Sequence, residues 1–163
     1  MNWATDPGIS ENIHRLVHAE TASLNKGDLD TWISLFSDDG YYWMPLEEEH
    51  ADPDKHDSLI YDNRALMEMR KHNLASPLSP SMQVKVRSVR VLSDIEIELI
   101  EWPDQEVKVS AFVIAVIYQQ QKNVYAGRLE YRLVNTDDGL KIKTKRVDLL
   151  DADAPLDCIM MYI

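Results

Sequence analysis

The chain has 163 residues, of which 45% are hydrophobic and 28% charged, and its 17 Lys+Arg against 28 Asp+Glu give a formal net charge of −11. This composition is typical of one globular domain, so we expect a single domain over residues 1–163 and exclude wholesale disorder. An acidic chain repels a phosphate backbone, and the longest apolar run, residues 109–117, is less than half of the roughly 20 residues that span a bilayer. Neither nucleic acid nor a membrane is therefore an expected partner.

The N-terminal third of the chain predicts a helical hairpin. Apolar residues at helical spacing indicate a helix over about residues 8–25, with Asp6 and Pro7 at its start and Gly27 at its end. A shorter helix is expected over residues 28–36, capped by its aspartate. Glu20 interrupts the apolar stripe of the first helix, so its carboxylate is expected to point into the core, where it needs a partner.

The next stretch predicts a short strand, a loop and a third helix. The aromatic residues 41–45 indicate the strand, which ends at a proline. Residues 47–57 carry six acids, two histidines and a proline without a regular period, which is typical of a solvated loop. The third helix is expected over about residues 59–73, before two prolines.

From residue 83 onward the hydrophobic period changes to two, which indicates strands. A change of phase near Ser88 predicts a β-bulge there, residues 102–104 predict a turn, and Asp138–Gly139 predicts a hairpin turn. The strands are expected at residues 84–91, 95–99, 107–120, 124–134 and 140–150, with an exposed apolar tail, 159–163, as an edge strand. Helices followed by antiparallel strands predict an α+β fold in which a curled antiparallel sheet encloses the N-terminal helices as a cone.

Two groups of metal-ligand residue types are better explained as solvated surface. Glu11, His14 and His18 lie opposite the apolar stripe of the first helix, and the acidic loop 47–57 lacks the glycine and distal glutamate of a calcium hand. A Rieske centre needs two cysteines and two histidines, and the chain has one cysteine, Cys158. We therefore expect no catalytic, cofactor-binding or metal-binding residue in this chain. The absence of a signal peptide and of a disulfide pair favours the cytoplasm.

A cone lined by tyrosines around a buried acid also suggests general acid–base chemistry, as in a dehydratase or isomerase. The groups available for it are Glu20, Tyr42, Tyr61, Asp62, Tyr125 and Tyr131. The simpler interpretation is that the tyrosines fill the cone and that Glu20 or Asp62 pairs with Arg64 or Arg70. Arg128, with the lysines of residues 141–145 across the hairpin, indicates an interaction surface or a solvated face.

Five stretches in order resemble the small, or beta, subunits of aromatic-ring-hydroxylating dioxygenases, the Rieske non-haem iron oxygenases, and in particular the benzoate-like and anthranilate-like branch. They are residues 18–25, 42–45, 60–64, 125–133 and 143–150. The resemblance implies a cystatin-like cone of the kind shared with nuclear transport factor 2. It also implies a trimer of small subunits beneath three large, or alpha, subunits.

In that family the large subunit carries the Rieske 2Fe-2S cluster, the mononuclear iron and the substrate pocket. The resemblance therefore implies a structural component of an oxidoreductase that holds no cofactor itself. The residues that it marks as structural or interface candidates are Glu20, Tyr42, Trp43, Pro45, Tyr61, Asp62, Arg64, Arg70, Gly127, Arg128 and Arg146. A stand-alone cone enzyme, a dehydratase or isomerase, and a small-molecule binding protein remain as alternatives.

Overall fold

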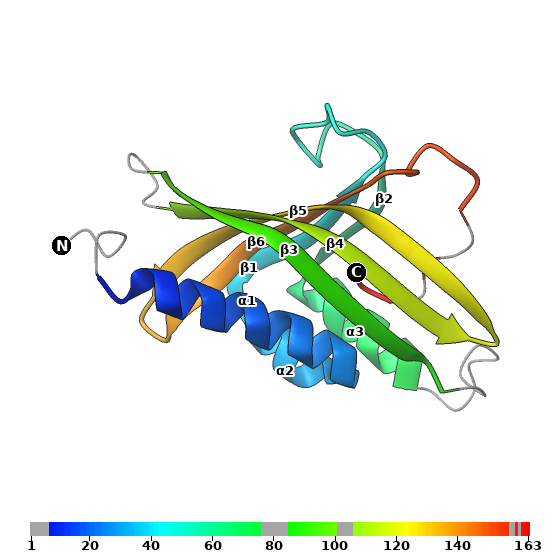
Figure 1. Cartoon of the computed structure of the whole chain (residues 1–163), viewed down its shortest axis with the longest axis horizontal. Helices are drawn as coiled ribbons and strands as arrows, with labels where there is room; N and C mark the ends of the chain where they lie inside the picture. Colours follow the sequence, from blue (N-terminus) through cyan, green and yellow to red (C-terminus); the bar gives the residue numbers. More distant parts are fainter. Residues whose placement is uncertain (1–6, 76–84, 101–105, 157–158, 160) are drawn as a thin grey trace.

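The computed structural model describes residues 7–75, 85–100, 106–156, 159 and 161–163. Within these ranges the chain forms three helices and one six-stranded sheet of order β2-β1-β6-β5-β4-β3, which curves over the helices (Figure 1). The elements are α1 (Ile9–Lys26), α2 (Leu29–Ser34), β1 (Phe36–Pro45), β2 (Ser58–Asn63), α3 (Arg64–Ala75), β3 (Arg87–Ile100), β4 (Glu106–Gln119), β5 (Gln121–Thr136) and β6 (Gly139–Leu149). The predicted α+β class and the packing of the N-terminal helices in a curled sheet are confirmed.

The helical hairpin forms where its apolar stripe and its end signals place it. Glu20 is buried in the stripe of α1, as predicted, and Gly27 ends the helix with a φ of 72°. The carboxylate of Asp28 accepts a 3.0 Å hydrogen bond from the N–H of Thr31, which caps α2. The expected cap Asp6 lies outside the described residues, and Gly8 occupies the N-cap of α1 without a side-chain hydrogen bond.

Two boundaries in the first half differ from prediction. Phe36 belongs to β1 rather than to the second helix, because it pairs in parallel with Ile142 of β6. The third helix begins at Arg64, not near residue 59. Residues 58–63 form β2, which pairs antiparallel with β1, and the side chain of Asn63 then accepts from the N–H of Leu66 at 3.0 Å. The free edge of β1 thus overrides the local helical spacing.

The predicted bulge near Ser88 is wrong, and the strands predicted at residues 84–91 and 95–99 are joined in one strand, β3, which begins at Arg87. The register shifts instead between Ser93 and Glu96, where Asp94 has a φ of 51°. The phase change seen in the sequence arises because Val89 and Val91 face outward, 52% and 63% exposed. The predicted turn at residues 102–104 lies outside the described ranges.

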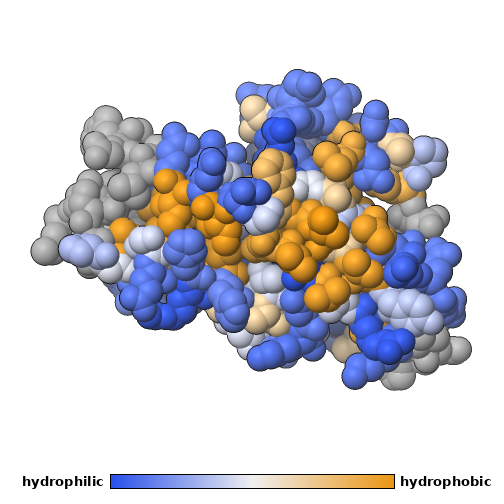
Figure 2. Space-filling view, in the orientation of Figure 1, coloured by the Kyte–Doolittle hydropathy of each residue, from blue (hydrophilic) through white to orange (hydrophobic). Residues whose placement is uncertain are grey.

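These two valines belong to an outer apolar patch on the convex face of the sheet. Its members come from three neighbouring strands whose outward side chains lie in register: Val89, Val91, Phe112, Ile114 and Val124, each about half exposed or more. Figure 2 shows hydrophobic side chains in a band across the middle of the molecule, between hydrophilic side chains above and below. Contiguous exposed apolar surface of this kind marks an interaction face.

The sheet is mixed rather than wholly antiparallel. Strands β4, β5 and β6 run antiparallel to one another in sequence, as predicted. Gly139, with a φ of 96°, makes the turn between β5 and β6. Strand β1 lies beside β6 in the same direction, with Trp43 opposite Arg146, and the long connection between them, through β2, α3 and β3 to β5, allows this parallel pairing. No helix in the described part of the chain is both long and apolar enough to cross a membrane.

The apolar tail is neither an edge strand nor exposed. Residues 159 and 161–163 lie outside the sheet, and Met161, Tyr162 and Ile163 are buried among the core side chains. The prediction fails because polar side chains inside the cone, rather than a strand edge, take the backbone hydrogen bonds of the last two residues.

Gly127 offers a test of how β5 and β6 pack. A Cβ at this position would lie 2.2 Å from the carbonyl oxygen of Asp148, which is backbone and has little freedom to move. Gly127→Ala is expected to lower the free energy of unfolding by about 2–3 kcal/mol in urea titrations. Ala126→Ser, one residue away and half-buried, should change it by less than about 0.5 kcal/mol. Equal changes in the free energy of unfolding for the two variants would contradict the close packing of Gly127 against Asp148.

Candidate functional site

A buried ion pair lies at the centre of the cone. Glu20 of α1 and Lys145 of β6 are each 1% exposed, and the lysine Nζ lies 2.6 Å from Oε1 of the glutamate. The same oxygen accepts from the indole N–H of Trp32 at 2.6 Å, and Oε2 accepts from the hydroxyl of Tyr131 at 3.0 Å. Each carboxylate oxygen therefore has a donor, which offsets the cost of burying the charge.

The partner of Glu20 is not Arg64 or Arg70, as the sequence suggested, but a lysine expected on the outer face. The pairing register between β5 and β6 shifts at Lys143. Ile142 and Lys145 therefore lie on the same face of the sheet. A bulge of this kind turns the following side chains to the opposite face of a strand. No feature of the Lys141–Arg146 alternation signals it.

Burial determines the protonation of the groups around this pair. Desolvation lowers the pKa of Lys145, and the charge and hydrogen bond of Glu20 partly offset that shift. Burial, together with the neighbouring carboxylate of Glu20, raises the pKa of Tyr131 well above its usual value. The hydroxyl of Tyr131 therefore keeps its proton and donates it in the hydrogen bond to Glu20.

The second predicted acid, Asp62, does form the ion pair expected of it. Its Oδ2 accepts from Nε of Arg70 at 2.7 Å and from the hydroxyl of Tyr162 at 2.7 Å. The hydrogen bond that Arg70 donates to Asp62 raises the pKa of Arg70, and burial, reinforced by Asp62, raises the pKa of Tyr162. Asp62 is 6% exposed, so this acid too is buried, and it is paired with an arginine.

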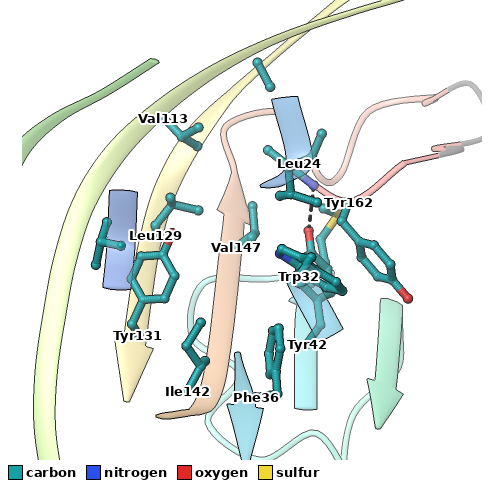
Figure 3. Close-up of a cluster of buried hydrophobic side chains, with 14 of the residues drawn as sticks. Leu24, Trp32, Phe36, Tyr42, Val113, Leu129, Tyr131, Ile142, Val147 and Tyr162 are labelled. Atoms are coloured by element: carbon teal, nitrogen blue, oxygen red, sulfur yellow. Dashed lines mark hydrogen bonds between the residues drawn. The ribbon is translucent and has the colours of Figure 1, made fainter. Parts of the chain in front are cut away.

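Aromatic rings fill the space between the two acids. Trp32 stacks on Tyr162 with ring centroids 4.3 Å apart, and the Tyr42 ring stands edge-on to Tyr162 at 4.8 Å. Figure 3 shows these three residues side by side, with Phe36 close to the Trp32 ring. Burial raises the pKa of Tyr42. The tyrosines therefore fill the cone, which is the simpler of the two interpretations.

The tail is fastened to this cluster through its backbone. Lys145 donates to the carbonyl of Ile163 at 2.6 Å, and the N–H of Ile163 donates to the Tyr42 hydroxyl at 3.2 Å. Arg90 of β3, 5% exposed, donates to the carbonyl of Tyr162. Sequence patterns missed the inward roles of Arg90, Lys145 and Tyr162, because an arginine within a strand and a terminal tyrosine carry no signal of burial.

Arg146 ties the acidic loop to the outer face of the sheet. Its guanidinium pairs with Asp148 at 2.8 Å, donates to the carbonyls of Glu48 and His50 at 2.6 Å, and lies 4.6 Å from the ring centroid of Trp43. This arginine and tryptophan therefore order a loop that the sequence showed only as polar.

The remaining outer candidates are more exposed. Arg128 pairs with Glu48 at 2.9 Å, and Arg64 pairs with Asp38 at 2.8 Å. Tyr61 is 38% exposed and lies outside the cone, so it cannot act with Glu20. The other positions named from the sequence are buried structural ones: Pro45 at the end of β1, Tyr125 on the inner face of β5, and Gly127 against β6.

Comparison with known proteins decides what kind of cone this is. Residues 19–154 match the ring hydroxylating beta subunit family. The chain belongs to this family. A curated relative, the small oxygenase component of the p-cumate 2,3-dioxygenase system of Pseudomonas putida, is 28% identical over 144 residues, which cover 87% of this chain and 79% of that protein.

Solved structures of beta subunits share the fold. The beta subunit of benzoate 1,2-dioxygenase from Burkholderia mallei has a TM-score of 0.72 at 24% identity, over 93% of this chain and 96% of that one. A chain of naphthalene 1,2-dioxygenase with indole bound has a TM-score of 0.80 at 14% identity, over 97% of this chain and 87% of that one. These structures show the fold, and the family match over residues 19–154 makes this chain the small subunit of a dioxygenase's oxygenase component.

The donor set of this beta subunit does not fit an iron–sulfur cluster or a mononuclear metal. The chain has one cysteine, and the described ranges contain no group of three or more His, Cys, Asp or Glu side chains that could hold a metal ion. His14 and His18 are exposed on α1, and the rings of His50 and His56 stack at 4.0 Å rather than converge on one point.

A cone enzyme needs an open pocket with a free acid, and the interior offers neither. Five hollows of about 270 to 490 Å³ lie on the described surface, and neither Glu20 nor Asp62 lines any of them. Both acids are hydrogen-bonded to cations. Within the described core, Glu20 and Asp62 therefore act as ion-pair partners.

Removing one partner of the central pair should be costly. Lys145→Met leaves the carboxylate of Glu20 buried without a cation, and the free energy of unfolding is expected to fall by about 3–5 kcal/mol. Adding Glu20→Gln should recover about 1 kcal/mol or more, because the uncompensated charge disappears. Urea titrations of both variants, with exposed Lys122→Met as the control, measure this; strictly additive losses would contradict a coupled pair.

The buried tyrosines predict alkaline unfolding. The pKa values of Tyr42, Tyr131 and Tyr162 are raised above 10.0, so the folded chain keeps protons that the unfolded chain loses, and stability falls as pH rises above about 10. The lowered pKa of Lys145 makes the free energy of unfolding rise with pH up to about pH 10.5, but this is one group against three tyrosines. The free energy of unfolding is expected to fall by about 4 kcal/mol per pH unit near pH 11.

Urea titrations between about pH 8 and about pH 11 measure that slope. Tyr42→Phe should reduce it by about a third, since one of the three titrating groups is gone. A stability that stays constant over this range would contradict the burial of the three hydroxyls.

Proposed function

We propose that this beta subunit is a structural component that assembles with a large alpha subunit of an aromatic-ring-hydroxylating dioxygenase in the cytoplasm. The alpha subunit carries the Rieske cluster and the mononuclear iron and hydroxylates an aromatic compound. Three beta subunits associate as a trimer within the complex. The observation that carries the proposal is the family match over residues 19–154, since it covers most of the chain.

The outer face supports a role in assembly. The outer apolar patch is exposed in the single chain, and isolated soluble proteins rarely leave contiguous apolar surface uncovered. The patch borders Arg128, whose guanidinium lies 5.7 Å from the ring centroid of Phe112. An apolar centre with a charged rim is the usual anatomy of a subunit interface.

The filled interior weighs against the alternatives. A dehydratase, an isomerase or a binding module would each need space beside Glu20 or Asp62, and indole, phenol rings and the tail occupy that space. The exposed face is where this chain can meet a partner subunit.

Co-expression tests the assembly directly. The chain, produced with a Rieske-type large subunit encoded beside it, is expected to yield a stable complex of three large and three small subunits, measured by light scattering. Iron and acid-labile sulfide should purify with the complex and be absent from the chain alone. A large subunit that is soluble, active and unaffected by this chain would overturn the proposal.

The outer apolar patch offers a sharper test. Val91→Lys and Ile114→Lys replace side chains that are 63% and 55% exposed, so the chain should fold normally while the yield of complex falls about tenfold or more. Met69→Lys on α3 is the matched control, because Met69 is 59% exposed but lies away from the patch. Equal complex yields from all three variants would show that the patch is not an interface.

A further inference from the structure

The tail is held inside the cone in the way that a protein holds a ligand. Tyr162 and Ile163 are 1% and 0% exposed and lie in neither a helix nor a strand. Their backbone groups bond to side chains: the Tyr42 hydroxyl accepts from the N–H of Ile163, and Lys145 and Arg90 donate to the two carbonyls. A segment belonging to the sheet would instead pair its carbonyls with backbone N–H groups.

The ring of Tyr162 occupies a slot built for a hydroxylated aromatic. Trp32 stacks against it at 4.3 Å, and Tyr42 stands edge-on at 4.8 Å. The guanidinium of Arg70 lies 5.5 Å from the ring centroid, and Asp62 accepts the phenol hydroxyl at 2.7 Å. One face, one edge and the hydroxyl of the ring are thus recognised by separate elements.

The other end of the slot is cationic. Arg90 is 5% exposed, yet its partners are the Asn25 amide oxygen at 3.3 Å, the Ser88 hydroxyl at 2.9 Å and a tail carbonyl, all of them uncharged. Its Nε has no hydrogen-bond partner among the residues described. Lys145 beside it bonds directly to Glu20, whose charge also attracts Arg90 without a hydrogen bond to it, so among the described residues Arg90 is a buried cation without a directly bonded anion. A carboxylate would satisfy it better than the neutral oxygen now in place.

We propose that the position of residues 162–163 is a binding site for a hydroxyaryl carboxylate, which the tail of the chain itself fills. The ring of the ligand would stack on Trp32, its hydroxyl would donate to Asp62, and its carboxylate would face Arg90 and Lys145. The site lies inside the cone, so the proposal goes beyond assembly at the outer face and does not depend on it.

A full-length variant with a polar tail opens the site. Tyr162→Ser together with Ile163→Ser removes the apolar gain that keeps the tail buried. The probe is 3-(4-hydroxyphenyl)propionate, which has the ring, hydroxyl and chain length of tyrosine with a carboxylate at its end. At about tenfold over its Kd the probe is expected to raise the Tm of this variant by about 4 °C, measured by circular dichroism.

Three controls distinguish binding at the position of the tail from binding elsewhere in the chain. The unsubstituted chain, whose tail fills the site, should show no shift. Val107→Ala should show none either, because Val107 is buried two strands away from Lys145 and eight residues along β4 from Ala115, the partner of Arg90. The neutral analogue 3-(4-hydroxyphenyl)propionamide should bind the double variant about tenfold more weakly than the acid.

The proposal is overturned if the probe leaves the double variant unchanged, if it shifts the Tm of the unsubstituted chain or of Val107→Ala equally, or if acid and amide bind alike. Should the double variant be unfolded alone, the probe is expected to increase its folded fraction, and a lack of any increase counts against the site in the same way.

Discussion

The ion pair between Glu20 and Lys145 is the contact on which the inside of this protein depends. It joins α1 to β6, and the same ammonium group reaches the carbonyl of Ile163, so one side chain connects helix, sheet and tail. Trp32 and Tyr131 complete the hydrogen bonds of the carboxylate. Because a buried charge without partners is strongly destabilising, the docking of each element depends on the others, and the interior is specified as a unit.

That arrangement separates the fold from enzymes that use a similar shape. In a cone enzyme an acid must remain free to exchange protons with a ligand, whereas here both Glu20 and Asp62 are bound to cations and covered by rings. The family membership is consistent with an interior in which both acids are held in ion pairs. Like a bound ligand, the tail offers its backbone groups to polar side chains inside the cone. It therefore closes the cone and supplies these side chains with hydrogen-bond partners.

Strand β3 connects the interior to the outer face. Arg90 points inward to the tail, while Val89 and Val91 on either side of it point outward into the outer apolar patch. The register shift at residues 93–96 lets this long strand curve while its two ends pair with β4. A partner that covers the patch would therefore rest on the strand that also holds the tail, and the stability of one face is linked to that of the other.

The sequence by itself determined the α+β class, the helical hairpin with its ends at Gly27 and Asp28, the inward position of Glu20 and the expectation that a buried acid pairs with Arg64 or Arg70. These follow from local periodicity, capping and the need of a buried acid for a cation. Only the tertiary structure decided that the lysine partner comes from a bulged strand, that β1 runs parallel to β6, that residues 58–63 form a strand, and that the tail lies inside. Each depends on which strand edge or buried cation is near in space, and single-chain patterns do not contain that information.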